Sequence, residues 1–278
     1  MRLLTWNIQC GKGCDGVTDL ARIVSVAREF SDADVYCFQE VSDNFPNLDG
    51  GKDQSAELAS LLPGYETVFR PAIEAVDAAG RTHRFGNITL SRLPVMQIAN
   101  HLLPWPGAAS VRSMRRQALD VTVQTAFGPL RVVNTHLEYH SVSQREAQIG
   151  RLLDLQEEAS AGAMLARTHR EPYAAQTLAA SSLLCGDFNF DVSDRQHALI
   201  AASARPGLNY RDAWSICHPG RPHALTCGLY DHAQWADGPD CRDFIFATED
   251  LAARIRRVEV NVETDASDHQ PILIELAD

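Results

Sequence analysis

The chain has 278 residues, of which 45% are hydrophobic and 22% are charged, and its net charge at pH 7 is −11. This composition is typical of a globular protein with a full-sized core, and the acidic balance argues against binding nucleic acid through a broad basic surface. No apolar run approaches the roughly 20 residues of a membrane-spanning helix, and the chain turns polar by Asn7, too early for a secretory signal peptide.

The cysteines give no sign of a disulfide framework. Cys10 and Cys14 are close enough in sequence to share a metal, but no second close pair completes a four-ligand site. An odd, scattered set fits a reducing compartment, so we expect a cytoplasmic protein. The sequence shows no sign of an obligate protein partner. No composition break marks a linker, and a single domain over residues 1–278 is favoured. The cysteines are at positions 10, 14, 37, 185, 217, 227 and 241.

The chain begins with a pattern that indicates a parallel strand pair. Residues 2–8 predict a strand that delivers Asn7 at its end. A helix beginning near Asp19 follows, and residues 34–38 predict a buried strand that delivers Glu40. Strand, helix and strand in succession form the unit of a parallel arrangement.

The next segments predict a helix over residues 54–62 and a strand over residues 66–70. Residues 73–84 are rich in Ala, Gly and charge, which favours an exposed loop beside a cleft. Residues 86–91 and 95–103 predict adjacent antiparallel strands.

A local basic cluster of three arginines, Arg112, Arg115 and Arg116, precedes a strand expected over residues 118–125. Such a cluster is either a solvated face or a contact for substrate phosphate.

A strand over residues 130–134 leads to Asn134 and His136, and a long helix starts near Ser143, where Ser143 and Glu146 have the spacing of a capping box. Residues 159–182 predict a mixture of helix end and loop.

The most informative stretch is residues 182–190, where a short apolar run ends in Gly-Asp-Phe-Asn. Residues two apart on a strand point to the same side, so Asp187 and Asn189 would project together from its end. The alternative is an Asx turn that caps the next helix, expected over residues 193–202.

Residues 205–239 are irregular and predict a functional surface loop. Strands are then expected over residues 242–247, 254–262 and 271–276, with Asp268 and His269 just before the last one.

One pattern therefore recurs along the chain: an apolar strand ends in a residue able to bind a hard cation or to move a proton. Each residue alone has a simpler explanation, as a turn former, an exposed acid or a hydrogen-bonded core histidine. The strand-end residues are Asn7, Glu40, His136, Asp187, Asn189, Asp243, Asp268 and His269.

Seven short motifs in this order resemble the signature of the endonuclease/exonuclease/phosphatase superfamily, whose fold is like that of deoxyribonuclease I. The resemblance spans residues 5–269. The motifs are Thr-Trp-Asn at 5–7, Gln-Glu at 39–40, Gly-Asn with Leu-Ser-Arg at 86–92, Asn-Thr-His-Leu at 134–137, Gly-Asp-Phe-Asn at 186–189, Asp-Phe-Ile-Phe at 243–246 and Ser-Asp-His at 267–269.

The resemblance implies an α/β fold, a four-layer sandwich of two facing mixed sheets flanked by helices. It also implies a Mg²⁺ site, with Mn²⁺ as a substitute, in which Glu40 is the main ligand and Asn7 and Asp268 lie nearby.

The remaining roles that the resemblance implies concern the reacting groups. Asp243 would orient His269, Asp187 and Asn189 would flank the attacking water and the phosphoryl oxygens, and His136 takes the place of a second histidine. A histidine held by a carboxylate suits either a general base or a charged donor, and the sequence leaves both open. Asn87, Arg115 and Arg116 are expected to bind substrate.

We therefore expect a divalent-metal-dependent phosphoester hydrolase, first a phosphodiesterase of nuclease type with nucleic acid among its candidate substrates. The alternatives are a phosphomonoesterase or a sphingomyelinase-like phosphodiesterase of lipid headgroups. A catalytically dead binding protein on the same fold is disfavoured because Glu40, Asp187 and His269 are all present. The acidic composition favours small, lipid-linked or single-stranded substrates over duplex DNA.

Overall fold

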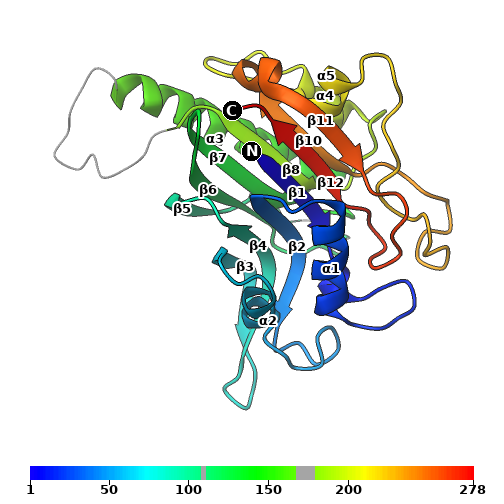
Figure 1. The fold of residues 1–278 in the computed structure, drawn as a ribbon. Helices are drawn as coiled ribbons and strands as arrows, with labels where there is room; N and C mark the ends of the chain where they lie inside the picture. The colour runs from blue at the N-terminus through cyan, green and yellow to red at the C-terminus, as the bar shows by residue number, and fades with distance from the viewer. Residues whose placement is uncertain (108–110, 167–178) are drawn as a thin grey trace.

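Two facing β-sheets form the centre of the molecule in the computed structural model, which describes residues 1–107, 111–166 and 179–278 (Figure 1). The first sheet holds, in spatial order, β11 (Ile255–Val260), β12 (Ile272–Leu276), β1 (Arg2–Asn7), β2 (Val35–Asp43), β4 (Thr82–Ser91) and β3 (Glu66–Val76). The second holds β5 (Val95–Leu102), β6 (Gln117–Thr125), β7 (Gly128–His136), β8 (Ser182–Asp187), β10 (Asp243–Thr248) and β9 (Tyr210–Asp212).

Both sheets are mixed, because β1 pairs in parallel with β2, and β7 with β8, whereas the other ladders are antiparallel. The parallel β1 and β2 pair agrees with the strand, helix and strand pattern in the sequence. Figure 1 shows the first and last strands side by side, and the Met1 amino group donates a hydrogen bond to the Leu276 carbonyl at 2.8 Å. The helices are α1 (Leu20–Phe30), α2 (Gln54–Leu61), α3 (Val142–Ala166), α4 (Arg195–Ala201) and α5 (Ala213–Cys217), with 3₁₀ turns at Gln9–Gly11 and Glu249–Arg254.

Three buried apolar clusters correspond to the contacts between four layers. One cluster lies between the sheets and includes Leu3 and Leu183. A second joins the outer face of the first sheet to α1 and α2, and a third joins the outer face of the second sheet to α3 and α4. The predicted four-layer α/β sandwich is therefore confirmed.

Alternation along the strands decides which polar side chains enter the space between the sheets. In β1, Leu3 belongs to the central cluster and Leu4 to the outer one, so Asn7 is on the same side as Leu3. In β8, Cys185 belongs to the central cluster, and Asp187 follows it by two residues. Strand ends thus direct polar groups into one edge of the central layer.

Gly186 allows β8 to approach β7 closely. Its φ is +135°, and a Cβ at this position would lie 1.8 Å from the Thr135 carbonyl oxygen. No other residue fits there without separating the two strands that carry His136 and Asp187.

The expected loop over residues 73–84 is wrong, because these residues form the hairpin between β3 and β4, with its turn at 77–81. Asp77 Oδ1 accepts hydrogen bonds from the backbone N–H groups of Ala79 and Arg81, which closes the turn. Much of this part of β3 is exposed, so the sequence carries no apolar alternation to reveal it.

The expected pairing of residues 86–91 with 95–103 is also wrong. β4 lies between β2 and β3 in the first sheet, whereas β5 is an edge strand of the second. The connection crosses between the sheets, and Arg92 fixes its start through ion pairs with Asp32 and Asp34, both at 2.8 Å.

The capping box predicted at the start of α3 is wrong as well. Ser141 Oγ, not Ser143, accepts from the Gln144 N–H at 3.3 Å, and Glu146 pairs with Arg195.

The irregular segment 205–239 contains the short elements β9 and α5. Of the expected mixed segment 159–182, residues 167–178 lie outside the described residues. None of the helices in the described ranges has the length and apolar content that a membrane crossing needs.

Candidate active site

A cleft of about 800 Å³ opens at the edge of the sheets where the predicted strand-end residues gather. Six of the eight strand-end residues line it, and the other two, Asn7 and Asp243, are buried beside them. The lining residues are Gln9, Glu40, Arg112, Ser113, Met114, Arg116, His136, Glu138, Tyr139, His140, Asp187, Asn189, Gln234, Trp235, Asp268 and His269.

His269 and Asp243 form a buried pair. His269 Nδ1 lies 2.8 Å from Asp243 Oδ2, and the two residues are 4% and 3% exposed. Burial alone would lower the pKa of His269, but Asp243, Asp268 and Asp187 outweigh it and raise that pKa well above its ordinary value. His269 is therefore protonated at neutral pH and has Nε2 available toward the cleft.

The backbone around this histidine is fixed by β1. Trp6 Nε1 donates to the His269 carbonyl at 2.8 Å, and Ser267 Oγ donates to the Asn7 carbonyl at 2.8 Å. The loop before β12 is thereby held against the end of β1, which explains how residues at opposite ends of the chain share one site.

Asp187 contacts both histidines of the site. Its Oδ2 lies 3.3 Å from His136 Nε2 and 3.7 Å from His269 Nε2, and it accepts from Asn7 Nδ2 at 3.0 Å. Burial would raise the pKa of Asp187, but the two imidazoles, of which His269 is the charged one, and the Asn7 hydrogen bond lower it overall. This carboxylate is ionised at neutral pH.

Asn189 orients the second histidine. Its Nδ2 lies 2.9 Å from His136 Nε2 and donates to the Leu137 carbonyl at 3.0 Å, while its N–H donates to Asp187 Oδ1 at 2.9 Å. Burial first, and then Arg116, lowers the pKa of His136 to about 3, so this imidazole is neutral. Among the described residues, its buried Nδ1 has no hydrogen-bond partner.

Glu40 and Asp268 form the carboxylate side of the cleft. Glu40 has a positive φ of 58° at an irregularity in the pairing of β2 with β4 between Phe38 and Val41, and such bulges re-aim side chains. Burial, and then the charge of Asp268, raises the pKa of Glu40, while Asn7 Nδ2 donates to Glu40 Oε1 at 3.1 Å. Asp268 Oδ2 accepts from Gln234 Nε2 at 2.7 Å and from Trp235 Nε1 at 3.2 Å.

This donor set fits a hard divalent cation. Two carboxylates line one side of an open cleft with an amide beside them, and the cost of keeping the partly exposed Glu40 ionised near Asp268 is the cost that a cation would reduce. Glu40 and Asp268 are the residues that would hold such an ion, with Asn7 beside them.

The predicted substrate residues are divided. Arg116 lines the cleft, is 6% exposed, and has its Nε 3.7 Å from Glu138 Oε2. Arg115 and Asn87 are not among the cleft residues: the Arg115 guanidinium lies over the ring of Trp105 at 4.9 Å, and Asn87 Nδ2 donates to the Asn134 carbonyl at 3.2 Å.

An aromatic and basic rim borders the cleft. The Arg242 guanidinium lies 4.9 Å from the ring centre of Trp235 and 5.5 Å from that of Tyr139. Trp235 therefore belongs to the cleft, whereas Trp214 packs on His218 and His223. The hairpin over residues 73–84, expected to flank the cleft, contributes nothing to its described lining.

Sequence reasoning missed Glu138, Tyr139 and His140, which follow His136 directly. Polar residues just after a strand end were the available signal. Gln9 gave no such signal because it comes from a turn. Gln234, whose side chain bonds to that of Gln9 at 3.0 Å, lies within residues 205–239, the segment predicted to be a functional surface loop.

The chain belongs to the endonuclease/exonuclease/phosphatase family, whose model matches residues 4–269. A family protein from Beutenbergia cavernae is 25% identical with a TM-score of 0.67, and the match covers 100% of this chain and 72% of that one. No curated protein sequence matches the chain.

Two further solved structures share the fold. A mannosyl-6-phosphatase from Bacteroides thetaiotaomicron is 16% identical with a TM-score of 0.69 and full coverage of both chains. The human Nocturnin catalytic domain, with a bound sulfate anion, is 19% identical with a TM-score of 0.64, over 100% of this chain and 93% of that one. The family supports a phosphoesterase as the general class of this protein.

Proposed function

We propose that the protein hydrolyses phosphodiesters with the help of a divalent cation, Mg²⁺ first and Mn²⁺ as a substitute. The observation that supports this most is the pairing of His269 with Asp243 at 2.8 Å beside ionised Asp187, facing Glu40 and Asp268 across one cleft. Acid, base and cation ligands then meet in the place where a phosphate would bind.

The charge states suggest how the roles divide. Asp187, whose pKa is lowered, acts as the base that takes a proton from the attacking water, and protonated His269 donates a hydrogen bond to a phosphoryl oxygen. Asp243 holds His269 in orientation through Nδ1.

Asn189 and His136 complete the donor set. Because Asn189 Nδ2 donates to His136 Nε2, neutral His136 carries its proton on Nδ1, the atom without a partner in the described structure. This buried N–H lies on the side of Glu40, with Nδ1 3.9 Å from Glu40 Oε1. A cation held by Glu40 and Asp268 would, when bound, offset the negative charge of the phosphoryl group.

The cleft rim favours an organic phosphodiester of modest size. Arg112 and Arg116 supply positive charge within the cleft, and Tyr139 and Trp235 offer faces on which a base or a sugar can pack. The net charge of −11 disfavours wide contact with a duplex, so single-stranded nucleic acid or a small diester is the substrate class we propose.

The test compares bis-p-nitrophenyl phosphate with p-nitrophenyl phosphate, with Mg²⁺, with Mn²⁺ and with chelator, on the native protein and on Glu40→Ala. We expect metal-dependent cleavage of the diester that chelator removes and that falls at least about 100-fold in Glu40→Ala. Activity that survives chelation, or that Glu40→Ala leaves intact, would refute the proposal.

A phosphomonoesterase is the second candidate, because two arginines in one cleft also suit the additional charge of a monoester dianion. Metal-dependent cleavage of the monoester alone would favour this candidate over the first.

A further inference from the structure

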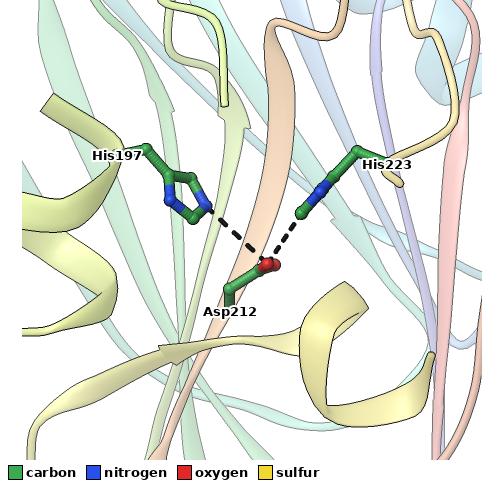
Figure 2. Close-up of side chains that lie close together, drawn as sticks. All are labelled: His197, Asp212 and His223. Atoms are coloured by element: carbon green, nitrogen blue, oxygen red, sulfur yellow. Dashed lines mark hydrogen bonds and ion pairs between the residues drawn. The ribbon is translucent and has the colours of Figure 1, made fainter. Parts of the chain in front are cut away.

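A second group of chemically active side chains lies outside the cleft, formed by His197 of α4, Asp212 at the end of β9 and His223 in the segment after α5 (Figure 2). His223 Nε2 is 2.7 Å from Asp212 Oδ2, and His197 Nε2 is 3.7 Å from the same oxygen. One ligand-type atom from each residue lies within 4.8 Å of the other two. Figure 2 shows both imidazoles directed at the carboxylate from opposite sides.

Aromatic rings enclose this group. His197 packs against Phe244 and Phe246 with ring centres 5.1 and 5.5 Å apart, and His223 is stacked on Trp214 at 5.8 Å. The side chains of His197 and His223 are 12% and 10% exposed. In the parts of the chain that are described, the buried Nε2 of His197 has no hydrogen-bond partner.

Hydrogen bonds hold the Asp212 carboxylate in one orientation. Its Oδ1 accepts from the Trp214 N–H at 3.1 Å, and Ser215 Oγ donates to Oδ2 at 2.5 Å, so the carboxylate orientation is fixed from behind.

We propose that His197, Asp212 and His223 bind a divalent transition-metal cation of the Zn²⁺ class. Two imidazole nitrogens and one carboxylate oxygen are a borderline-soft set, which suits zinc better than Mg²⁺. With bonds of about 2.0–2.1 Å, tetrahedral ligand atoms lie about 3.4 Å apart, and the 3.7 Å between His197 Nε2 and Asp212 Oδ2 is close to that spacing. The 2.7 Å between His223 Nε2 and Asp212 Oδ2 is a hydrogen-bond distance, which an ion would replace with a longer spacing. The ion would give His197 Nε2 the partner that it lacks.

The surroundings indicate a structural ion. The cavity bordered by Asp212 and His223, which His197 does not line, has only about 10 Å³ free, so it has no room for a substrate. Fully coordinated, enclosed zinc stabilises local structure, whereas catalytic zinc keeps an open position.

The ion would fasten one wall of the catalytic cleft. Residues 218–242 connect α5 to β10 and include Gln234 and Trp235 of the cleft. Three residues after His223, Thr226 Oγ1 accepts from the N–H groups of Arg242 and Asp243, both at 3.0 Å. An ion that joins His223 to α4 and β9 would therefore hold the start of this segment in place.

The first experiment measures zinc content. The purified full chain is stripped with chelator, loaded with Zn²⁺, exchanged into metal-free buffer and analysed for metal per chain, beside His197→Gln, His223→Gln and the exposed control His232→Gln. We expect each cluster variant to retain about one zinc fewer than the native chain and His232→Gln to retain the native amount. Glu40→Gln alters the carboxylate side of the cleft and leaves the His197, Asp212 and His223 cluster unchanged. This variant should therefore retain the zinc ion that the cluster variants lose.

Unchanged zinc content in both cluster variants would overturn the proposal. The proposal would also be overturned if Glu40→Gln lost all of the zinc that the native chain retains, because the ion would then belong to the cleft. Circular dichroism in chelator checks that the variants are folded.

A second measurement needs no cluster variant. In Glu40→Gln, added Zn²⁺ should slow amide hydrogen exchange in peptides from residues 195–226 several-fold. Exchange there that zinc does not change would also overturn the proposal.

Discussion

Two aspartates in this molecule each lie between two histidines, yet their surroundings differ. Asp187 Oδ2 is 3.3 and 3.7 Å from its two imidazoles, and Asp212 Oδ2 is 2.7 and 3.7 Å from its own. In both cases the histidines lower the pKa of the carboxyl against the effect of burial.

What differs is the access to each cluster and its additional charge. The Asp187 cluster faces a cleft of about 800 Å³ and is joined by Glu40, Asp243 and Asp268, whereas the Asp212 cluster borders about 10 Å³ among aromatic rings. The first has room for a substrate, and the second does not. We therefore propose that a similar trio of residues supports chemistry in one place and local stability in the other.

The largest effect is expected from removing the charged donor of the open cluster. His269→Ala should lower kcat/KM for a diester substrate by about 1,000-fold or more, because it removes a protonated donor that Asp243 positions toward the phosphoryl group. Steady-state hydrolysis of bis-p-nitrophenyl phosphate at saturating metal measures this loss. His101→Ala, on edge strand β5, is the matched control and should retain native activity. A His269→Ala protein with more than a tenth of native activity would contradict the assigned role.

Asp243→Asn should have a smaller effect on the same cluster. We expect kcat to fall about 100-fold while KM stays within about twofold, since the amide keeps the shape of the carboxyl but not its charge on His269. Separate determination of kcat and KM checks this split. Asp250→Asn, at an exposed carboxylate that accepts from Ser181, controls for the loss of one acidic charge. A rise in KM with unchanged kcat would place Asp243 in substrate binding instead.

The open cluster was the more accessible of the two to sequence reasoning. Asn7, His136 and Asp187 each end an apolar strand, which was visible in the sequence. His136 and Asp187 end the parallel neighbours β7 and β8 of one sheet, whereas Asn7 ends β1 of the other sheet and reaches them through the packing of the two sheets. The catalytic roles of these residues stay predictions. Glu40 illustrates the limit, because the bulge that directs it has no sequence signal beyond the motif itself.

The enclosed cluster could not be predicted. His197 comes from a helix, Asp212 from a three-residue strand within a segment that had no regular pattern, and His223 from an irregular connection. Only the tertiary packing of β9 on β10 brings them together. The errors over residues 73–84 and in the pairing of β4 have the same origin, since partner choice between strands is a long-range property.

Asp212→Ala should affect stability rather than chemistry. The variant loses the acceptor of the Trp214 and Ser215 N–H groups at the start of α5 and leaves His223 Nε2 without its partner. We therefore expect the unfolding free energy to fall by about 2 kcal/mol. Urea unfolding followed by circular dichroism measures the loss. At low temperature kcat should stay within about threefold of native.

The converse variant, Asp187→Ala, completes the comparison. It should lose activity by at least about 100-fold while costing less unfolding free energy than Asp212→Ala, because it also relieves repulsion among the carboxylates of the open site. If the two variants exchanged these phenotypes, the division between an open chemical cluster and an enclosed structural one would be wrong.

A further buried carboxylate, Asp43, has Asp53 as its charged neighbour in place of the histidines of the two clusters. Burial, together with the nearby Asp53, raises the pKa of Asp43 to about 6, the opposite of the shift at Asp187 and Asp212. Because this folded-state pKa lies above the ordinary value of 3.8, the folded protein loses stability as pH rises from about 4 to 6 and Asp43 ionises.

Asp43→Asn removes that ionisation and keeps an oxygen for the Ser55 N–H, which now donates to Asp43 Oδ1 at 3.1 Å. We expect the variant to be more stable than the native protein by about 1 kcal/mol at pH 7, a figure reduced from the full shift because the pKa of Asp53 moves in the opposite direction and solvent screens the pair. Urea unfolding at pH 4 and at pH 7 checks this, since the advantage should be small at pH 4 and complete above pH 6. An equal difference at both pH values would mean that the Ser55 hydrogen bonds, and not the charge at Asp43, decide stability there.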